Sequence, residues 1–205
     1  MGTIVGLTTV IASCANDEAS TGDCALSPNE MAGPFPIKTP TDLVRESIVS
    51  DRTGVALLMT LTIQDKSNGC TPLAGVFVDV WHCDAEGSYS EYGALTAQDF
   101  LRGRQTTDSN GQVSFISIFP GWYPGRAPHI HIEVLNATEN SLRVTQIAFP
   151  ESICDTVYAT PAYKGTADTS NTGDGVFINS LNGNMADSVT GNITDGYTLQ
   201  KTIVV

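Results

Sequence analysis

The chain has 205 residues, of which 41% are hydrophobic and 16% are charged, and it contains 19 glycines. This composition supports one sizeable core with many turns, but not a second large domain. Ten lysines and arginines stand against 22 aspartates and glutamates, which gives a formal net charge of -12. Because binding to nucleic acid or to an anionic lipid surface needs clustered positive charge, both classes of partner are excluded.

Residues 4–13 are apolar and uncharged, and Cys14 follows them directly. This pattern is similar to a bacterial lipoprotein signal with Cys14 as the lipidated residue, although the usual positive charges before the apolar run are missing. We therefore predict a signal segment over residues 1–14, a flexible segment over 15–30 and a β-sandwich domain over 31–205. The predicted location is outside the cytoplasm, either lipid-anchored to the bacterial cell envelope or secreted. The alternative is a disordered apolar leader, because the run is too short for a membrane-spanning helix.

If Cys14 carries a lipid, an even number of cysteines remains. These are Cys24, Cys70, Cys83 and Cys154. They predict two disulfides in an oxidising compartment, with one of three connectivities. The alternative is a set of reduced, buried thiols in a cytoplasmic protein.

Runs with strand patterning recur between turns, at residues 55–64, 76–81, 112–118, 129–135, 144–149 and 197–205. Residues 108–111 read Asp-Ser-Asn-Gly, which is typical of a chain reversal. Long amphipathic helical patterns are absent, so the sequence predicts an all-β fold, an antiparallel β-sandwich with long active-site loops. Residues 163–174 are rich in Gly, Thr, Asn and Asp, and they predict a surface loop.

The strand predicted at residues 76–81 ends in a turn at 84–87, so Tyr89 stands just beyond a strand end. His82 and Cys83 lie beside this turn, but no Cys-x-x-Cys pair is present to complete a zinc site with them. We interpret His82 as a packed or hydrogen-bonded residue at the end of the strand.

The run from Trp122 to His131 holds two of the chain's three histidines together with a tyrosine and an arginine. In an extended strand, His129 and His131 point to one face while Ile130 points to the other. Two imidazoles on one face readily bind a transition metal, and Tyr123 and Arg126 lie close to them in the chain. The alternative is two ordinary polar residues on the solvent face of a strand.

A competing metal site would use Glu133 as a carboxylate ligand beside the two histidines, because residues 129, 131 and 133 share a strand face. Positions i and i+4 of a strand lie about 13 Å apart at the backbone. Glu133 is therefore poorly placed to share an ion with His129.

Several motifs together resemble the intradiol ring-cleavage dioxygenases, the family of catechol 1,2-dioxygenase and protocatechuate 3,4-dioxygenase. The similar segments are Gly33-Pro34-Phe35, Leu43-Val44-Arg45, Pro72-Leu73-Ala74-Gly75, the blocks 78–85 and 87–90, Leu101-Arg102-Gly103 and the block 121–131. They span most of residues 30–150, and the family fold agrees with the predicted sandwich. The resemblance is to the short, single-domain branch of the family.

The resemblance implies a non-haem ferric ion, Fe(III), held by two tyrosinates and two histidines. The matching positions are Tyr89, Tyr123, His129 and His131. Arg126 matches the arginine that stabilises negative charge on the substrate ring. Gln146 matches a glutamine that lines the pocket, whereas Ala148 stands where the family commonly has an aromatic residue.

The implied reaction cleaves a catechol-type ring between its two hydroxylated carbons with O2 and yields a cis,cis-muconate-type diacid. A catechol would bind the iron as a dianion and displace Tyr123. The acidic net charge favours catechol-like substrates over carboxylated ones. The alternative is a secreted β-sandwich protein that binds a ligand or metal without turnover. A membrane is expected as a partner only through Cys14, and no oligomeric state is predicted.

Overall fold

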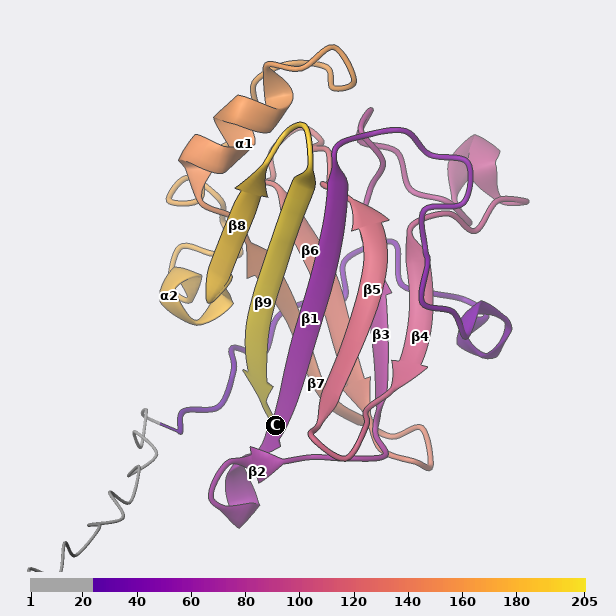
Figure 1. Cartoon of the computed structure of the whole chain (residues 1–205), viewed down its shortest axis with the longest axis vertical. Helices are drawn as coiled ribbons and strands as arrows, with labels where there is room; N and C mark the ends of the chain where they lie inside the picture. The colour runs from indigo at the N-terminus through magenta and orange to yellow at the C-terminus, as the bar shows by residue number, and fades with distance from the viewer. Residues whose placement is uncertain (1–23) are drawn as a thin grey trace, which may run out of the picture.

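The protein's structure, a computed structural model, describes residues 24–205 and consists of two β-sheets packed face to face (Figure 1). The strands are β1 (Ala56–Asp65), β2 (Thr71–Pro72), β3 (Phe77–Trp81), β4 (Arg102–Thr106), β5 (Gln112–Ile118), β6 (His129–Leu135), β7 (Ser141–Ala148), β8 (Ser188–Asn192) and β9 (Gly196–Val204). The helices are α1 (Glu151–Tyr158) and α2 (Leu181–Asn184), with 3₁₀ turns at Pro40–Leu43, Lys66–Asn68 and Gly93–Leu95. The predicted all-β sandwich is confirmed.

The front sheet in Figure 1 has the strand order β2-β1-β9-β8, and β5 also pairs with β1. The second sheet, which we call the β6 sheet, has the order β4-β3-β6-β7. Its three pairings are antiparallel, as predicted. In the front sheet β1 and β9 run parallel, a departure from a purely antiparallel sandwich.

Three strands were not predicted: the two-residue strand β2, and the longer strands β4 and β8. Strand β4 reads Arg-Gly-Arg-Gln-Thr, and its two arginines are buried, Arg102 at 0% and Arg104 at 3% exposure. Arg104 is buried because it donates two hydrogen bonds to Asp79, from Nε at 2.6 Å and from Nη2 at 2.8 Å. Such a pairing across strands leaves no hydrophobic alternation in the local sequence.

The core lies between the sheets and is built from alternate residues of each strand. Its residues on the β6 sheet include Val78, Val80, Ile130, Ile132 and Val134. Leu57, Met59, Leu61, Phe115 and Leu199 meet them from the front sheet. The odd-numbered residues of β6 therefore point away from the core, as the alternation of His129, Ile130 and His131 predicted.

The outer face of the β6 sheet carries a row of side chains across all four of its strands. Arg102 pairs with Trp81, Trp81 with His131, and His131 with Gln146. In the next row, Asp79 pairs with Glu133. Both histidines of β6 are buried, so this outer face is covered by the loops around it.

The chain before β1 takes part in the fold from Ser27 onward. Ser27 N donates to Val204 O at 3.1 Å, and Glu30 N donates to Val144 O at 2.8 Å. Residues 24–30, predicted as part of a flexible segment, thus connect β9 of one sheet with β7 of the other. The predicted signal segment and Cys14 lie outside the described residues.

The prediction of two disulfides is wrong. Cys24 and Cys70 form a disulfide with a Cα–Cα distance of 6.0 Å, whereas Cys83 and Cys154 are buried free thiols. They cannot pair because Cys83 packs with Trp81 and Cys154 packs in the main core, two separate hydrophobic clusters. Burial raises the pKa of each thiol to about 12.

We expect reduction of the Cys24–Cys70 disulfide to lower the free energy of unfolding by about 2–4 kcal/mol, because it closes a long loop. The two cysteines are 46 residues apart in the chain. Urea unfolding of the wild type and of the Cys24→Ser/Cys70→Ser variant measures the difference. Equal stability of the two proteins would contradict the prediction. As a control, alkylation of the native wild type should leave Cys83 and Cys154 unmodified.

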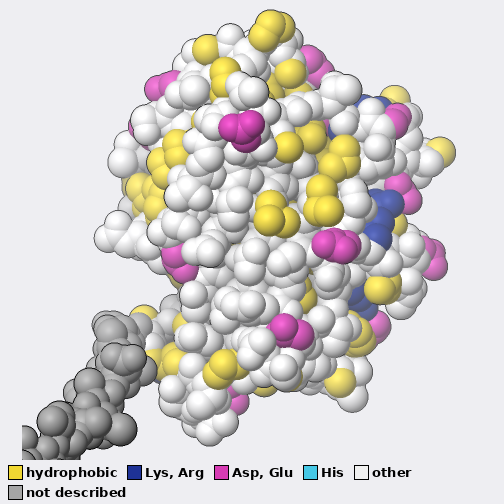
Figure 2. Space-filling model, viewed as in Figure 1, with side chains coloured by type: hydrophobic (Ala, Val, Ile, Leu, Met, Phe, Trp, Pro, Cys, Tyr) yellow, Lys and Arg dark blue, Asp and Glu magenta, His cyan; other side chains and the backbone are white. Residues whose placement is uncertain are grey.

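Figure 2 shows the outer face of the front sheet. Acidic side chains are scattered singly over this face, and lysines and arginines lie along its right border. Leu58 and Ile116 are paired in register on β1 and β5 and are 41% and 45% exposed. No helix within residues 24–205 has the length and apolar character to cross a membrane.

Candidate metal centre

The four predicted metal ligands come from three places in the fold. His129 and His131 lie on β6, Tyr89 on the loop between β3 and β4, and Tyr123 on the loop between β5 and β6. Gly87 brings these two loops together: its φ is +86°, and a Cβ there would collide with the carbonyl oxygen of Trp122. The close approach of the loops thus requires glycine.

The two histidines direct their Nε2 atoms at each other, 3.1 Å apart. His129 Nδ1 lies 2.6 Å from the carbonyl oxygen of Ala127. A carbonyl only accepts, so Nδ1 carries the proton and Nε2 presents a lone pair to the site. Burial, with Arg126 next in importance, lowers the pKa of His129 to about 3, and burial also holds the pKa of His131 well below its ordinary value. Both rings are neutral, as metal ligation requires.

The two phenols complete the cluster. Tyr123 Oη lies 3.3 Å from His129 Nε2. Tyr89 Oη is buried without a hydrogen-bond partner in the described part of the chain, and its ring lies 5.8 Å from that of Tyr123 and 6.3 Å from that of His131 between centroids. Burial raises the pKa of both phenols, so a cation in contact is needed to ionise them at neutral pH.

These donors fit a ferric ion. Phenolate oxygen is a hard, anionic donor, and neutral imidazole binds iron among several metals. Burying the Tyr89 hydroxyl without a hydrogen-bond partner is unfavourable, and a metal bound to its oxygen would supply the missing partner. Within residues 24–205, no three His, Cys, Asp or Glu side chains are placed to hold a metal, so the competing set with Glu133 is not assembled.

Arg126 lies beside the donors with its guanidinium fully engaged. Nε donates to Asp174 Oδ2 at 2.8 Å, and Nη2 donates to Gln146 Oε1 at 2.6 Å. Nη1 lies 3.5 Å from Tyr123 Oη. Gln146 in turn donates from Nε2 to the carbonyl oxygen of Met31 at 2.9 Å. The structure thus brings together Arg126, Gln146 and Tyr123, the three residues that the family resemblance implies for the pocket.

Asp174 is the site residue that sequence reasoning missed. It is fully buried, and its Oδ2 also accepts from Ala127 N at 2.7 Å, while Oδ1 accepts from Val176 N at 2.8 Å. Burial raises the pKa of Asp174, but the hydrogen bonds from Arg126, Val176 and Ala127 outweigh it, so the net shift is downward. Asp174 lies 48 residues from Arg126 in a region without periodicity, which left no local signal.

For the ring cleavage that the family resemblance implies, we expect Asp174→Asn to lower the turnover number about 10–100-fold. Removal of a group that orients a site residue without touching the substrate has an effect of this size. Its free energy of unfolding should fall by about 1–3 kcal/mol at pH 7. The pKa of Asp174 is lowered in the folded protein. The difference in stability between wild type and variant should therefore be present in full above the pKa of the unfolded state, about 3.9, and should disappear as the pH falls through the pKa of the folded state. Steady-state kinetics and urea unfolding between pH 7 and acid measure both effects.

The control for this variant is Asp155→Asn, which neutralises an exposed carboxylate on α1. It should leave turnover and stability close to wild type. Wild-type turnover in Asp174→Asn, or a stability difference that persists in acid, would refute the assignment.

The predicted surface loop at residues 163–174 also anchors the Tyr123 loop. Trp122 Nε1 donates to Gly165 O at 2.7 Å, and Gly125 N donates to Asp168 Oδ1 at 3.2 Å. With Asp174 on Arg126, the loop holds the segment around Tyr123 at both of its ends.

The third histidine, His82, is outside the donor cluster. It is fully buried, and its Nδ1 donates to Cys83 O at 2.8 Å while Nε2 accepts from Ser117 Oγ at 2.7 Å. Burial lowers its pKa to about 4, so the ring is neutral. The interpretation of His82 as a hydrogen-bonded strand-end residue is confirmed.

Ala148 departs from the family pattern, and Phe177 occupies the space beside it. Ala148 and Phe177 are both fully buried and pack together with Ala127. The Phe177 ring lies 6.3 Å from that of His129 in an edge-on arrangement. An aromatic side chain from a distant loop thus packs on the wall of the site.

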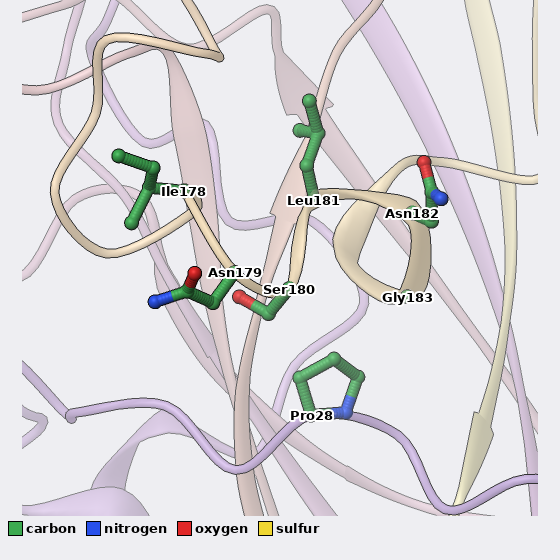
Figure 3. A pocket seen from close by; sticks show the side chains of 7 residues that line it. All are labelled: Pro28, Ile178, Asn179, Ser180, Leu181, Asn182 and Gly183. Atoms are coloured by element: carbon green, nitrogen blue, oxygen red, sulfur yellow. The ribbon is translucent and has the colours of Figure 1, made fainter.

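A groove of about 530 Å³ lies away from the donor cluster, between Pro28 and residues 178–183 (Figure 3). Its walls are Ile178, Leu181, glycine, serine and asparagine, with no titratable side chain among the described residues that line it. It offers no group for acid–base or metal chemistry.

Together, fold and site define a β-sandwich protein with a donor cluster of two tyrosines and two histidines on the outer face of one sheet. Comparison with known proteins agrees. Residues 35–169 match a family model described as Dioxygenase. Among solved structures, an intradiol ring-cleavage dioxygenase from Tetranychus urticae is 32% identical, with a TM-score of 0.78 over 88% of this chain and 94% of that one.

Two characterised sequences are similar over shorter stretches. Chlorocatechol 1,2-dioxygenase of Rhodococcus opacus is 31% identical over 120 residues, 49% of this chain and 46% of that protein. The protocatechuate 3,4-dioxygenase beta chain of Burkholderia cepacia is 31% identical over 122 residues, 53% of this chain and 51% of that protein. The chain thus spans about half the length of these relatives. It belongs to the intradiol ring-cleavage dioxygenase family, as its motifs predicted.

Proposed function

We propose that the protein is a non-haem Fe(III)-dependent dioxygenase that opens a catechol-type ring between its two hydroxylated carbons and yields a cis,cis-muconate-type diacid. The observation that carries the proposal is the convergence of His129 Nε2, His131 Nε2 and Tyr123 Oη beside the unpartnered Tyr89 Oη. These four residues would hold the iron. A binding protein without turnover has no need for this donor set together with Arg126.

A ferric ion would orient both catechol oxygens and stabilise their negative charge. Tyr123, which is partly exposed and lies next to Arg126, is suited to leave the metal and accept a catechol proton. Arg126 presents directed N–H donors that stabilise the negative charge that builds on the ring. In the balanced reaction the bond between the two hydroxylated carbons breaks, both atoms of O2 enter the product, and the ring supplies the electrons that reduce O2.

The substrate we propose is a catechol without a ring carboxylate. The two buried or half-buried arginines at the site are already paired, Arg126 with Asp174 and Arg102 with Glu91. A carboxylate on the ring would add a full second charge where each cation is already balanced by Asp174 or Glu91, and it would lose its hydration. Initial rates with catechol and protocatechuate at equal iron content test this preference.

The first test is an ultraviolet-visible spectrum with metal analysis, before and after anaerobic addition of catechol. Ferric tyrosinate gives a broad visible charge-transfer band, which should shift when catechol binds. Tyr89→Phe should weaken the band, whereas Tyr197→Phe, which alters a tyrosine in the main core, should leave it unchanged. A protein that stays colourless after ferric reconstitution, or that carries zinc, would favour the binding protein.

We also infer that the protein is exported, either lipid-anchored through Cys14 or secreted. The Cys24–Cys70 disulfide supports this proposal, because disulfides persist mainly in oxidising compartments. Fractionation of cells that make the wild type or Cys14→Ala, with labelled palmitate, tests it. Recovery of unlabelled protein from the cytoplasm in both cases would contradict it.

A further inference from the structure

Arg102 is a buried cation beneath the Tyr89 side of the donor cluster. It is fully buried and begins β4, in the cross-strand row that contains Trp81 and His131. Nε donates to Ser90 Oγ at 2.9 Å, and Nη2 donates to the carbonyl oxygen of Ser90 at 2.7 Å. Two of its bonds therefore hold the residue directly after Tyr89.

The same guanidinium also reaches a segment far away in the chain. Nη1 donates to the carbonyl oxygen of Phe35 at 2.8 Å. The Phe35 ring stacks on Tyr89, with 4.6 Å between centroids. Two residues earlier, Gly33 has a φ of +68°, and a Cβ there would lie 3.0 Å from His131 Cε1. The segment 33–38 thus covers both the Tyr89 ring and the His131 ring.

Further contacts join this segment to the Tyr89 loop. Tyr92 Oη donates to Pro36 O at 2.8 Å, and Lys38 Nζ donates to Glu91 O at 2.6 Å. Glu91 Oε2 lies 3.3 Å from Arg102 Nε and supplies the opposite charge. Arg102 adds a third link between the Tyr89 loop and the segment 33–38, because each of its three side-chain nitrogens donates to one of these two segments.

Such a buried arginine is stable only while its acceptors are in place. A buried charge without partners is strongly unfavourable, and the acceptors here are two carbonyl oxygens, one hydroxyl and one carboxylate. The planar guanidinium donates in several fixed directions at once, which the ammonium of lysine cannot do. Loss of the guanidinium therefore releases both segments, even when a positive charge remains.

We propose that Arg102 is a positioning residue of the metal centre, which fastens the Tyr89 loop to the segment 33–38 and so holds the Tyr89 phenol and the His131 ring at the iron. The proposal rests on the ferric site proposed above. Arg102 touches neither iron nor substrate, so its effect passes through Ser90 and Phe35.

The test compares Arg102→Lys, Phe35→Ala and Arg104→Lys. Arg104 is the matched control: it is a buried arginine on the same face of β4, and its partners are Asp79 and Glu139. The first readout is amide hydrogen exchange in the metal-free protein, which needs no iron. The second is the visible charge-transfer band and the iron affinity after ferric loading.

In Arg102→Lys we expect exchange at residues 33–38 and 88–92 to rise at least about tenfold relative to β1 and β6. The charge-transfer band should shift, and iron affinity should fall about 10–100-fold. Phe35→Ala should shift the band in the same direction, since it removes the ring that packs on Tyr89. Arg104→Lys should leave the band and these two segments unchanged.

Unchanged exchange and an unchanged band in Arg102→Lys would overturn the proposal. Faster exchange throughout the sandwich, as loss of global stability produces, would overturn it as well. If the wild type itself binds no ferric iron, the proposed function fails and with it the metal role of Arg102. The exchange readout then still decides whether Arg102 joins the two segments.

Discussion

Replacing His131 with alanine is expected to abolish ferric loading and the visible charge-transfer band. His131 Nε2 lies 3.1 Å from His129 Nε2, at the point where the donors converge, and the ring is 1% exposed, so solvent cannot easily supply a substitute ligand. Iron affinity should fall by more than about 10–100-fold, which is the effect of removing a group that only hydrogen-bonds to a metal ligand. Iron analysis and absorbance after ferric reconstitution measure the effect, and urea unfolding shows whether the sandwich remains folded.

The matched control is His82→Ala, because His82 is equally buried but hydrogen-bonds to Cys83 and Ser117 instead of facing the donors. It should cost stability, since Ser117 Oγ loses its partner, yet it should retain iron and colour. If His131→Ala keeps full iron content, or if His82→Ala loses its iron while folded, the assignment of the ligand set is wrong.

Arg126→Lys is expected to lower kcat by about 10²–10³-fold, the effect of removing one directed donor from developing negative charge. Lysine can keep the ion pair with Asp174, but it cannot also bind Gln146 and approach Tyr123, as the three nitrogens of Arg126 do. Iron content and colour should stay at the wild-type level, because Arg126 is not a ligand. Steady-state kinetics with catechol at matched iron content measure the loss.

Lysine is the informative substitution at this position. Arg126→Ala would leave Asp174 as an unpaired buried carboxylate, at a cost of about 3–5 kcal/mol, and would confuse unfolding with loss of chemistry. Arg104→Lys, which alters another arginine paired to a buried carboxylate, should retain wild-type kcat. A kcat for Arg126→Lys within threefold of wild type would remove the arginine from the proposed mechanism.

Strands with hydrophobic alternation were predicted well. The bounds of β6 and β5 agree with the predicted ranges 129–135 and 112–118, because every second residue of each strand enters the core. Strand β8, which reads Ser-Val-Thr-Gly-Asn, carries one aliphatic residue and was missed. The parallel pairing of β1 with β9 joins two strands that are far apart in the sequence. The hydrophobic pattern within either strand carries no information about such a pairing.

In the candidate site too, residues that lie close together in the sequence were easier to predict than residues that only the fold brings together. His129, His131 and Tyr123 attracted attention because they lie within one short run, whereas Tyr89 was proposed as a ligand only through the family resemblance. Asp174 was missed because the carboxylate reaches Arg126 only through the path of the loop 163–174. The pairing of Cys24 with Cys70, and the separate burial of the other two cysteines, likewise depends on the tertiary fold.

The alternation along β6 separates two selective pressures within seven residues. Ile130, Ile132 and Val134 are constrained by volume, since they fill the space between the sheets. His129 and His131 lie on the opposite face, in the donor cluster proposed to hold the iron. A redesign that exchanges the donors for those of another metal therefore leaves the packing between the sheets intact. Substitutions on the histidine face of β6 can therefore change the chemistry of the site while the same two-sheet scaffold is kept.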